Sequence, residues 1–400
     1  MGPSETVTTG RPAARAPDAP IIPAASRGEA FTSFDVDAFE VPSAHDEAWR
    51  FTPLKRLRGL HDGTAPATGR ATVDVQAPAE VTVQTVGRED GRLGTAGTPA
   101  DRVAAQAWTS FTDATVVSVP QEVQVTEPVM LTVTGPGLDK VAYGHTQIRL
   151  EPFARAVVIV DQRGSGTFAE NLELVVGDSA HLTVVTVQDW ADDAVHVAAH
   201  HLMLGRDATI RHSAISLGGS VVRLTPTVRY TASGADAQLL GVYFADAGQH
   251  LEQRIFIDHT QPHCRSDVMY KGALQGAPGS NLPDARTVWI GDVLIRAEAE
   301  GTDTFELNRN LILTDGARAD SVPNLEIETG EIANAGHASA TGRFDDEQLF
   351  YLRSRGISEE QARRLVVRGF FHEVLAKITV ASVRERLEAA IETELAAVGI

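Results

Sequence analysis

A single cysteine, Cys264, sets the first limit on the metal chemistry of this 400-residue chain. One thiol cannot close an intramolecular disulfide, and it cannot build a multi-cysteine metal site. Any metal bound here therefore needs ligands of another type, or ligands from another chain. We interpret Cys264 itself as a small, buried, apolar side chain.

Histidine is the second residue type that could hold a metal. His196 and His200 are four residues apart, and a strand would place both on one face, as in a metal-binding pair. We interpret them, with the adjacent His201, as part of a solvated face. His337 stands alone beside a glycine, where a histidine is more often a turn or interface residue than a ligand.

Motifs for phosphate binding and for a serine nucleophile are absent from the sequence. No GxxxxGK[ST] loop occurs, and the glycine-rich stretches at 135–137 and 164–166 do not continue into GxGxxG, so we predict that they are turns. There is also no GxSxG elbow. The chain is therefore expected neither to hydrolyse ATP nor to act as a serine hydrolase.

The charge balance disfavours two classes of partner. The chain has 53 acidic and 35 basic residues, a formal net charge of -18, so its field repels nucleic-acid phosphates and anionic lipids. No apolar run is long enough to span a bilayer, and no apolar signal core occurs near the amino terminus. We expect a cytoplasmic protein with no nucleic-acid or membrane partner.

The secondary structure that must position these residues is predicted to differ between successive regions of the chain. Residues 1–30 are rich in Pro, Ala, Thr and Gly and are predicted to be a disordered tail. Ser43 could begin a helix that ends at Pro53, so residues 31–69 are predicted to form a small helical region. Hydrophobic residues make up 43% of the chain, which is enough for a large core in the part that follows.

Residues 70–342 are predicted to be all β. Short runs of Val, Ile, Leu and Thr are broken by Gly, Asp, Asn and Pro, with almost no helical period. Asp178, Asp207 and Asp236 follow glycines at steps of 29 residues, and an apolar stretch follows each. Such a period is typical of stacked coils, although hairpins with similar turns, as in a β-sandwich, would produce it too.

Residues 343–400 switch to a helical period. Asp345 with Gln348 could cap one helix, and Ser358 with Gln361 could cap the next. In the last helix four apolar residues form a stripe at four-residue steps: Val383, Leu387, Ile391 and Leu395. Such a stripe usually packs on its own domain, but a partner protein could bury it instead.

A family resemblance is carried by many segments that occur in order from about residue 43 to the end. They are 47–54 (EAWRFTPL), 217–219 (LGG) with Arg223, 240–243 (LGVY), 258–259 (DH), 262–272, 302–303 (TD), 308–311 (NRNL), 323–327 (PNLEI) and 336–357. The chain resembles the SufB/SufD family of the SUF iron–sulfur cluster assembly scaffold. The amino-terminal segment, the modest length and the lack of a cysteine near the end of the β region favour the SufD branch over SufB.

The resemblance implies a fold and a set of partners. The fold would be a right-handed parallel β-helix over 70–342, flanked by helical regions. The partners would be the homologous SufB, through a β-helix edge, and two copies of the ATPase SufC, docked on the helices of 343–400. The chain itself would be a non-catalytic subunit that shares a nascent iron–sulfur cluster with SufB. Reduced FAD is a further cofactor reported for such complexes, although no flavin motif is visible here.

The resemblance also changes the interpretation of His337. This residue matches the histidine that the SufD branch is thought to offer to the nascent cluster, and neutral imidazole is a competent iron ligand. The family often has a cysteine two residues earlier, where this chain has Ala335. His337 is therefore expected to contribute imidazole without an accompanying thiolate.

Alternatives from other classes stay open at this point. A β-helix carbohydrate lyase or hydrolase of the secreted type would need clustered carboxylates along a groove, and it would need a secretion signal, which is missing. A purely structural β-helix would need no ligand at all. A homodimer of the isolated chain, paired through the end strands, is also compatible with the sequence.

Overall fold

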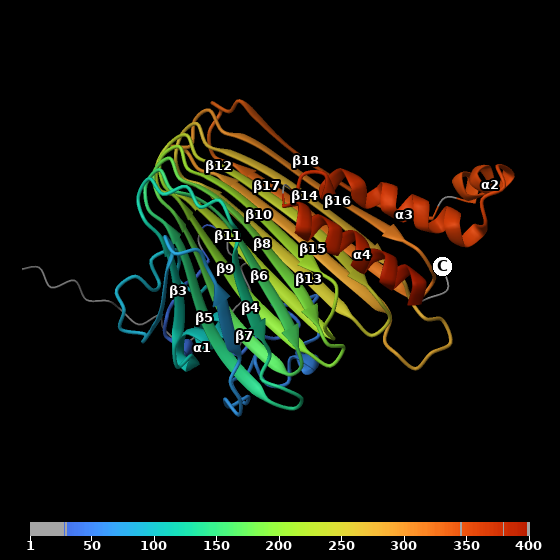
Figure 1. Cartoon of the computed structure of the whole chain (residues 1–400), viewed down its shortest axis with the longest axis horizontal. Helices are drawn as coiled ribbons and strands as arrows, with labels where there is room; N and C mark the ends of the chain where they lie inside the picture. The colour runs from blue at the N-terminus through green and yellow to red at the C-terminus, as the bar shows by residue number, and fades with distance from the viewer. Residues whose placement is uncertain (1–27, 29, 345, 379, 398–400) are drawn as a thin grey trace, which may run out of the picture.

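Two long sheets of short strands lie face to face in the computed structural model, which describes residues 28, 30–344, 346–378 and 380–397 (Figure 1). The predicted tail at 1–30 falls almost wholly outside these residues, as does Asp345. Within the described residues each sheet has nine strands. Sheet A consists, in order, of β1 (Thr72–Gln76), β4 (Val129–Thr134), β6 (Arg155–Gly164), β8 (His181–Trp190), β10 (Thr209–Ser216), β12 (Asp236–Ala245), β14 (Arg265–Leu274), β16 (Asp303–Ile312) and β18 (Asn334–Arg343). Sheet B consists, in order, of β17 (Ala317–Ile327), β15 (Ala285–Ile295), β13 (His250–His259), β11 (Val221–Tyr230), β9 (Val195–Leu204), β7 (Thr167–Val176), β5 (Val141–Leu150), β3 (Ala114–Val119) and β2 (Thr82–Val86).

The chain alternates between the sheets, so each coil of the fold contains one strand from each. From β3 and β4 onward every neighbouring pair within a sheet is parallel, as between β8 and β10 or between β9 and β11. At the amino-terminal end the short strands β1 and β2 instead pair antiparallel with β4 and β3. The fold is therefore a parallel β-helix, as the resemblance predicted, and the β-sandwich alternative is wrong.

The interior core follows from strand alternation, because every second side chain of each strand points between the sheets. In sheet A one inward column stacks Val158, Val184, His212, Leu239 and Val268 on successive strands. Four of these five side chains are apolar, and all five are buried. The Val- and Leu-rich runs of the sequence thus supply one continuous core along the coils.

The turns from sheet B to sheet A recur in successive coils at steps of 27 to 29 residues, so the coil period matches the predicted 29-residue repeat only approximately. A residue with positive φ recurs at the same place in successive turns: Ser179 (55°), Asp207 (51°), Gly234 (81°) and His263 (57°). Each backbone N–H here donates to a carbonyl of the next coil, as from Ser179 to Arg206 at 2.7 Å. Asp178 also accepts from the Arg206 N–H at 2.8 Å. The three aspartates are not in register with one another, because Asp236 pairs with Thr209 and Thr209 pairs with His181.

The amino-terminal part differs from the prediction of a helix between Ser43 and Pro53. The structure has turns there, followed by the short 3-10 helix η3 (Leu54–Leu57), and another 3-10 helix, η2 (Val36–Ala38), lies before them. The Ser43 N–H donates to the Asp46 carboxylate at 2.7 Å, and such local side-chain bonds compete with helix formation. An α-helix, α1 (Arg102–Ser110), lies instead within the range predicted to be all β.

The carboxy-terminal helices are α2 (Asp346–Ser354), α3 (Glu359–Leu375) and α4 (Ala381–Ala397). Ser358 caps α3 as predicted, accepting from the Gln361 N–H at 3.3 Å. In Figure 1, α3 and α4 lie across sheet A, whereas α2 projects away from the body. Their apolar residues join the outward apolar residues of sheet A in one cluster that is separate from the interior core.

The apolar stripe of the last helix is buried by the chain itself. Val383, Leu387 and Ile391 are 5%, 0% and 2% exposed and pack on the outer face of sheet A, while the Leu395 side chain lies outside the described residues. Arg386 reinforces the contact through ion pairs with Asp161 at 2.9 Å and Asp189 at 2.8 Å. Of the two alternatives left by the sequence, packing on the stripe's own domain is therefore confirmed.

Candidate functional site

The two ends of the β-helix differ in how their sheet edges are finished. At the carboxy-terminal end β17 and β18 are 11 and 10 residues long, and neither pairs with a further strand among the described residues. At the other end β1 and β2 have five residues each and run antiparallel to their neighbours. Because a long free edge is a template for pairing with another strand, the last coil is the end suited to a partner.

His337 lies in this last coil and faces the interior column. On the same strand Ala335 packs against the interior core, and the Thr341 hydroxyl accepts from the Asn310 side chain at 3.3 Å. Since alternate residues share a face, the His337 side chain also points inward, in register with Glu306 on β16. His337 is nevertheless exposed, because no described strand covers the end of the column.

Glu306 is the functional candidate that the sequence analysis missed. It is 1% exposed, and neither of its carboxylate oxygens has a hydrogen-bond partner among the described residues. Burial, followed by the charge of Asp292, raises the pKa of Glu306 to about 8. A Cβ added to Gly291, on the facing sheet, would lie 2.6 Å from Oε1. The sequence contained only one indication of this candidate, which was an acidic residue at a position of the strand that alternation would place inside the β-helix.

Other polar side chains of the same coils are joined in a hydrogen-bond network. The Asn308 amide donates to the Tyr243 hydroxyl at 2.8 Å, and that hydroxyl donates to the Asn310 carbonyl oxygen at 2.8 Å. The Asn310 amide donates in turn to Ser321 on β17 at 3.0 Å and to Thr341 on β18 at 3.3 Å. The network ties the last coil to the interior, and it explains the NRNL segment of the sequence.

The glycines of two family segments have a packing role. Gly241 on β12 is in register with Tyr270 on β14, and Tyr243 is in register with Gly272. A Cβ at either glycine would collide with the tyrosine ring of the other strand. The LGVY segment and the YKG segment therefore fit together as two reciprocal glycine–tyrosine pairs.

The remaining metal-ligand candidates do not form a second site. Cys264 is buried, with its Sγ 3.5 Å from the Ala232 carbonyl, and burial raises the pKa of its thiol. No group of three or more His, Cys, Asp or Glu residues placed to hold a metal is found among the described residues. The Cys264 prediction is thus confirmed, and His337 has no ready-made metal cage in the part of the chain that is described.

The prediction that His196 and His200 form a solvated face is wrong. Both are 0% exposed, because strand alternation places them inside the β-helix. Nε2 of His196 lies 3.3 Å from the Glu170 carboxylate, and Nδ1 of His200 lies 3.1 Å from Nε2 of His212. Burial lowers the pKa of His200 well below its ordinary value, so this residue is a neutral core histidine.

The two glycine-rich stretches are turns, as predicted. Gly137 donates its N–H to the Ser165 carbonyl at 3.0 Å, so the two turns stack on neighbouring coils. Gly164 and Gly166 have φ values of 94° and 107°, which only glycine adopts readily. Both glycines therefore allow the chain to turn between strands.

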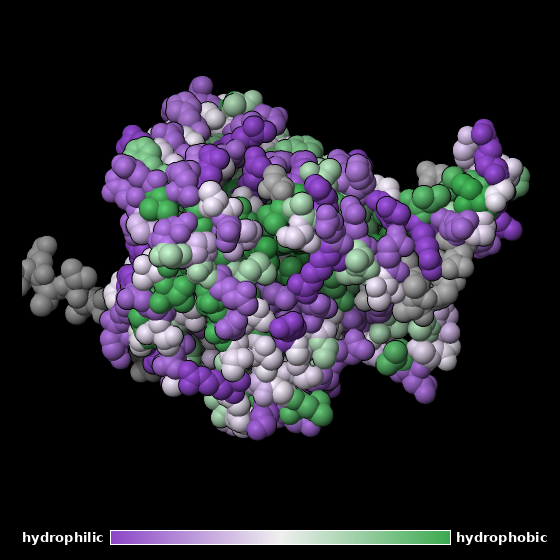
Figure 2. Space-filling view, in the orientation of Figure 1, coloured by the Kyte–Doolittle hydropathy of each residue, from purple (hydrophilic) through white to green (hydrophobic). Residues whose placement is uncertain are grey.

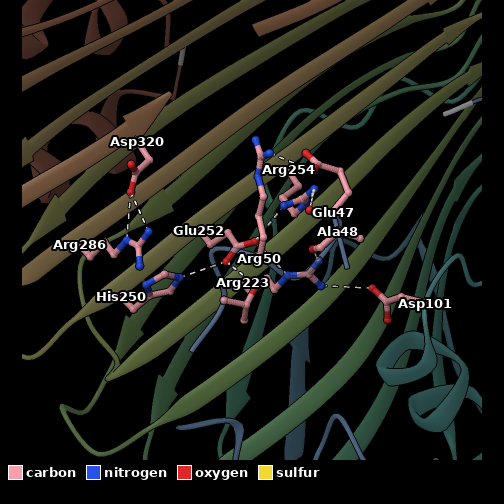
Figure 3. A network of polar contacts seen from close by, with 11 residues as sticks. Glu47, Ala48, Arg50, Asp101, Arg223, His250, Glu252, Arg254, Arg286 and Asp320 are labelled. Carbon is pink, nitrogen blue, oxygen red and sulfur yellow. Dashed lines mark hydrogen bonds and ion pairs between the residues drawn. The ribbon is translucent and has the colours of Figure 1, made fainter. Parts of the chain in front are cut away.

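The amino-terminal segment is anchored on the outer face of sheet B by a buried charge network (Figure 3). Arg223 on β11 contacts the Glu252 carboxylate and the Asp101 carboxylate, both at 3.2 Å, and donates to the Ala48 carbonyl at 3.0 Å. Thr52 donates its hydroxyl to Glu252 at 2.8 Å. The EAWRFTPL segment therefore has a structural role, which is to dock the first part of the chain on the β-helix.

The arm formed by α2 carries exposed apolar side chains. Phe350 is 75% exposed and Tyr351 is 57% exposed. Figure 2 shows hydrophobic surface on this projecting arm. A groove of about 320 Å³ also runs along α3 and α4 and is lined by residues that include Leu365, His372 and Ile391. Exposed aromatic groups on a projecting helix are typical of a protein-binding surface.

These features define a class of protein: a parallel β-helix whose amino-terminal segment docks on the outer face of sheet B and whose last coil has unpaired strand edges among the described residues. No helix among the described residues is long and apolar enough to cross a membrane. Residues 132–370 match the family model described as "SUF system FeS cluster assembly, SufBD core domain". The chain belongs to the SufBD family of iron–sulfur cluster assembly proteins.

Individual relatives agree with this assignment. An iron–sulfur cluster assembly SufBD family protein of Mycobacterium bovis is 67% identical over 370 residues, which cover 92% of this chain and 93% of the relative. The iron–sulfur cluster assembly protein SufD of Escherichia coli is 26% identical over 220 residues, 55% of this chain and 50% of that protein. A second SufBD family protein of M. bovis is 26% identical over 207 residues, 52% of this chain and 24% of that protein.

Proposed function

We propose that this chain is the SufD-like component of a SufB–SufC–SufD scaffold for iron–sulfur cluster assembly. In this role it catalyses no reaction of its own and helps the nascent cluster and its iron to assemble at the interface with SufB. The observation that carries the proposal is the position of His337, inward-facing yet exposed, on the unpaired last coil. The similarity to the E. coli SufD supports the same assignment.

The proposed interface with SufB uses the free edges of β17 and β18. A partner with the same fold could continue both sheets, because its strands would have the same spacing and length. The presence of two SufBD family proteins in M. bovis, one similar to this chain and one distant, is consistent with pairing between unlike members. In the absence of SufB, the same edges would favour a homodimer of the isolated chain.

In the proposed ligand role, this chain supplies only some of the ligands of the cluster-binding site. The nascent cluster is the cargo, and His337 offers it a neutral imidazole, which binds iron well. Thiolate ligands must come from elsewhere, because Cys264 is buried against Ala232 and Ala335 stands where a cysteine would have accompanied His337.

His337→Ala in the co-expressed three-subunit complex tests the ligand role. We expect the complex to form as in the wild type, because an exposed side chain on β18 contributes little to packing, and we expect its iron and sulfide content to fall severalfold. Ser339→Ala is the matched control, since Ser339 lies two residues along the same strand, faces the same way and is exposed. Wild-type cluster content in His337→Ala would show that the ligand role is wrong.

We propose that SufC docks on the helices of residues 343–400, with the α2 arm as its main contact. Phe350 and Tyr351 are the exposed aromatic residues of that arm, and aromatic side chains supply much of the energy of protein interfaces. Replacing both by alanine should weaken SufC capture by about 30-fold or more, which corresponds to the loss of a hot spot of about 2 kcal/mol. Leu138→Ala, which removes another exposed apolar side chain, should leave capture unchanged. Equal capture by both variants would place the docking surface elsewhere.

A further inference from the structure

The buried carboxyl group of Glu306 is unusual within its own surroundings. Polar groups two and four residues along the same strand, in Asn308 and Asn310, are held by hydrogen bonds. A buried polar group without a partner costs free energy on the order of 1–3 kcal/mol. A native protein retains such a group where it has a task, and an unsatisfied buried atom therefore needs an explanation.

The position of Glu306 in the inward column of sheet A suggests why an unsatisfied carboxyl group is retained there. The column is apolar at Leu239 and Val268, becomes acidic at Glu306 and ends with His337 in the open coil. Neighbouring parallel strands are about 4.8 Å apart, so the two side chains lie one above the other on the same inward face. Only the last coil separates the Glu306 carboxyl from the end of the β-helix.

The facing sheet leaves room for the carboxyl group. At Gly291 on β15 an added Cβ would lie 2.6 Å from Glu306 Oε1, so any side chain at this position would displace the carboxyl group. The indole Nε1 of Trp289 and the hydroxyl of Tyr270, on β15 and β14, are also buried with no hydrogen-bond partner among the described residues. Three buried side chains, on β14, β15 and β16, thus have unsatisfied polar atoms close to the last coil.

We propose that Glu306 is a second metal-ligating residue of this chain, which binds ferrous iron together with His337 at the open coil. This inference rests on the proposed function of His337. Imidazole and carboxylate together suit a divalent first-row metal such as iron(II). The remaining ligands come from the partner subunit or from sulfide, because the described residues contain no third ligand grouped with these two.

The test uses the anaerobic three-subunit complex with ferrous iron alone as the probe, before any sulfide is supplied. Glu306→Gln keeps the shape of the side chain and removes the carboxylate. We expect Glu306→Gln and His337→Ala each to weaken iron binding by at least about tenfold and to change the Mössbauer spectrum of bound ⁵⁷Fe. Glu331→Gln, the same change at an exposed position just before β18, should leave iron binding unchanged.

The melting temperature of Glu306→Gln gives a second readout, because a metal-binding role and a purely structural role of Glu306 predict changes in opposite directions. A carboxyl group kept at a cost for metal binding predicts an unchanged or higher melting temperature in Glu306→Gln without iron, whereas a stabilising carboxyl group predicts a lower one. Glu306→Asp, which keeps the carboxylate, should retain more iron than Glu306→Gln, and equal iron affinity in the two variants would count against ligation. If Glu306→Gln fails to fold, Glu306→Leu replaces it, and wild-type iron affinity in Glu306→Leu would then overturn the proposal.

The outcomes distinguish this inference from the proposed function. Weakened iron binding in His337→Ala with wild-type binding in Glu306→Gln overturns the role of Glu306 and leaves that of His337 intact. Wild-type iron binding and cluster content in both variants overturn both proposals. Weakened binding in both variants, with the spectrum altered in each, supports the shared site.

Discussion

The guanidinium carbon of Arg223 lies 3.8 Å from the centroid of the Trp49 ring, which joins the amino-terminal segment to the middle of sheet B. The two residues are 174 positions apart in the sequence (223 − 49), and both are buried, at 1% and 4% exposure. The same arginine holds the Glu252 carboxylate. One side chain therefore combines a cation–π contact with a buried ion pair, and its loss should release the segment.

Arg223→Met should destabilise the protein by about 3–5 kcal/mol, because it keeps most of the side-chain volume but removes a main partner of a buried carboxylate. Urea denaturation measures the loss, and hydrogen exchange should show faster exchange around residues 47–57. Arg50→Ala is the control, since Arg50 pairs with Glu47 at the surface. Unchanged stability in Arg223→Met would mean that the network does not anchor the segment.

Leu387→Ala should detach or loosen α4. Leu387 is 0% exposed and packs against the outer face of sheet A, so its truncation leaves a cavity that costs about 2–5 kcal/mol. Urea denaturation and protease cleavage within 376–397 measure the effect. Glu385→Ala, on the exposed side of the same helix, should behave as the wild type. Equal stability in the two variants would contradict packing of α4 on sheet A.

Gly241→Ala should destabilise the β-helix by about 1–3 kcal/mol, because the added methyl group collides with the Tyr270 ring in a packed interior. Gly369→Ala in α3 should have the opposite effect, since a Cβ there meets nothing within 4 Å and alanine favours a helix by about 1 kcal/mol. Thermal unfolding of the two variants compares them directly. A stabilised Gly241→Ala would contradict the glycine–tyrosine pairing.

The buried histidines should make the protein sensitive to mild acid. Burial lowers the pKa of His259 from 6.5 to about 3, so below pH 6.5 the unfolded chain binds a proton that the folded chain does not. The contribution to stability is complete above pH 6.5 and falls by up to about 1.4 kcal/mol per pH unit as the pH decreases towards 3.

His259→Gln should flatten the dependence of unfolding free energy on pH in this window, by about one proton. The other buried histidines would still titrate, so a slope should remain. His45→Gln, at an exposed position, serves as the control and should leave the slope unchanged. An identical slope in His259→Gln and the wild type would show that the pKa of His259 is the same in the folded and unfolded states, which would contradict the lowering by burial.

Local patterns were sufficient for the coarse architecture. The short Val- and Leu-rich runs predicted stacked coils because each coil repeats a similar turn and the same inward face, although the 29-residue steps match the coil length of 27 to 29 residues only approximately. The cap of α3 at Ser358 was predictable for a similar reason, since it depends on residues three positions apart. By contrast, the helix expected from Ser43 was wrong, because Asp46 and the docking of Trp49 on sheet B hold that segment in turns.

The candidate site could be predicted only in part from local sequence patterns. The family resemblance selected His337 from the sequence, and the presence of only one cysteine already implied that any metal site would be shared. Glu306 became a candidate only in the folded chain, because its isolation depends on Gly291 across the interior and its proximity to His337 depends on the register of β16 and β18. The burial of His196 and His200 was decided in the same way. Sequence spacing determines which residues share a face of a strand, but the face that is buried, and the residues stacked above and below, depend on contacts between coils about 30 residues apart.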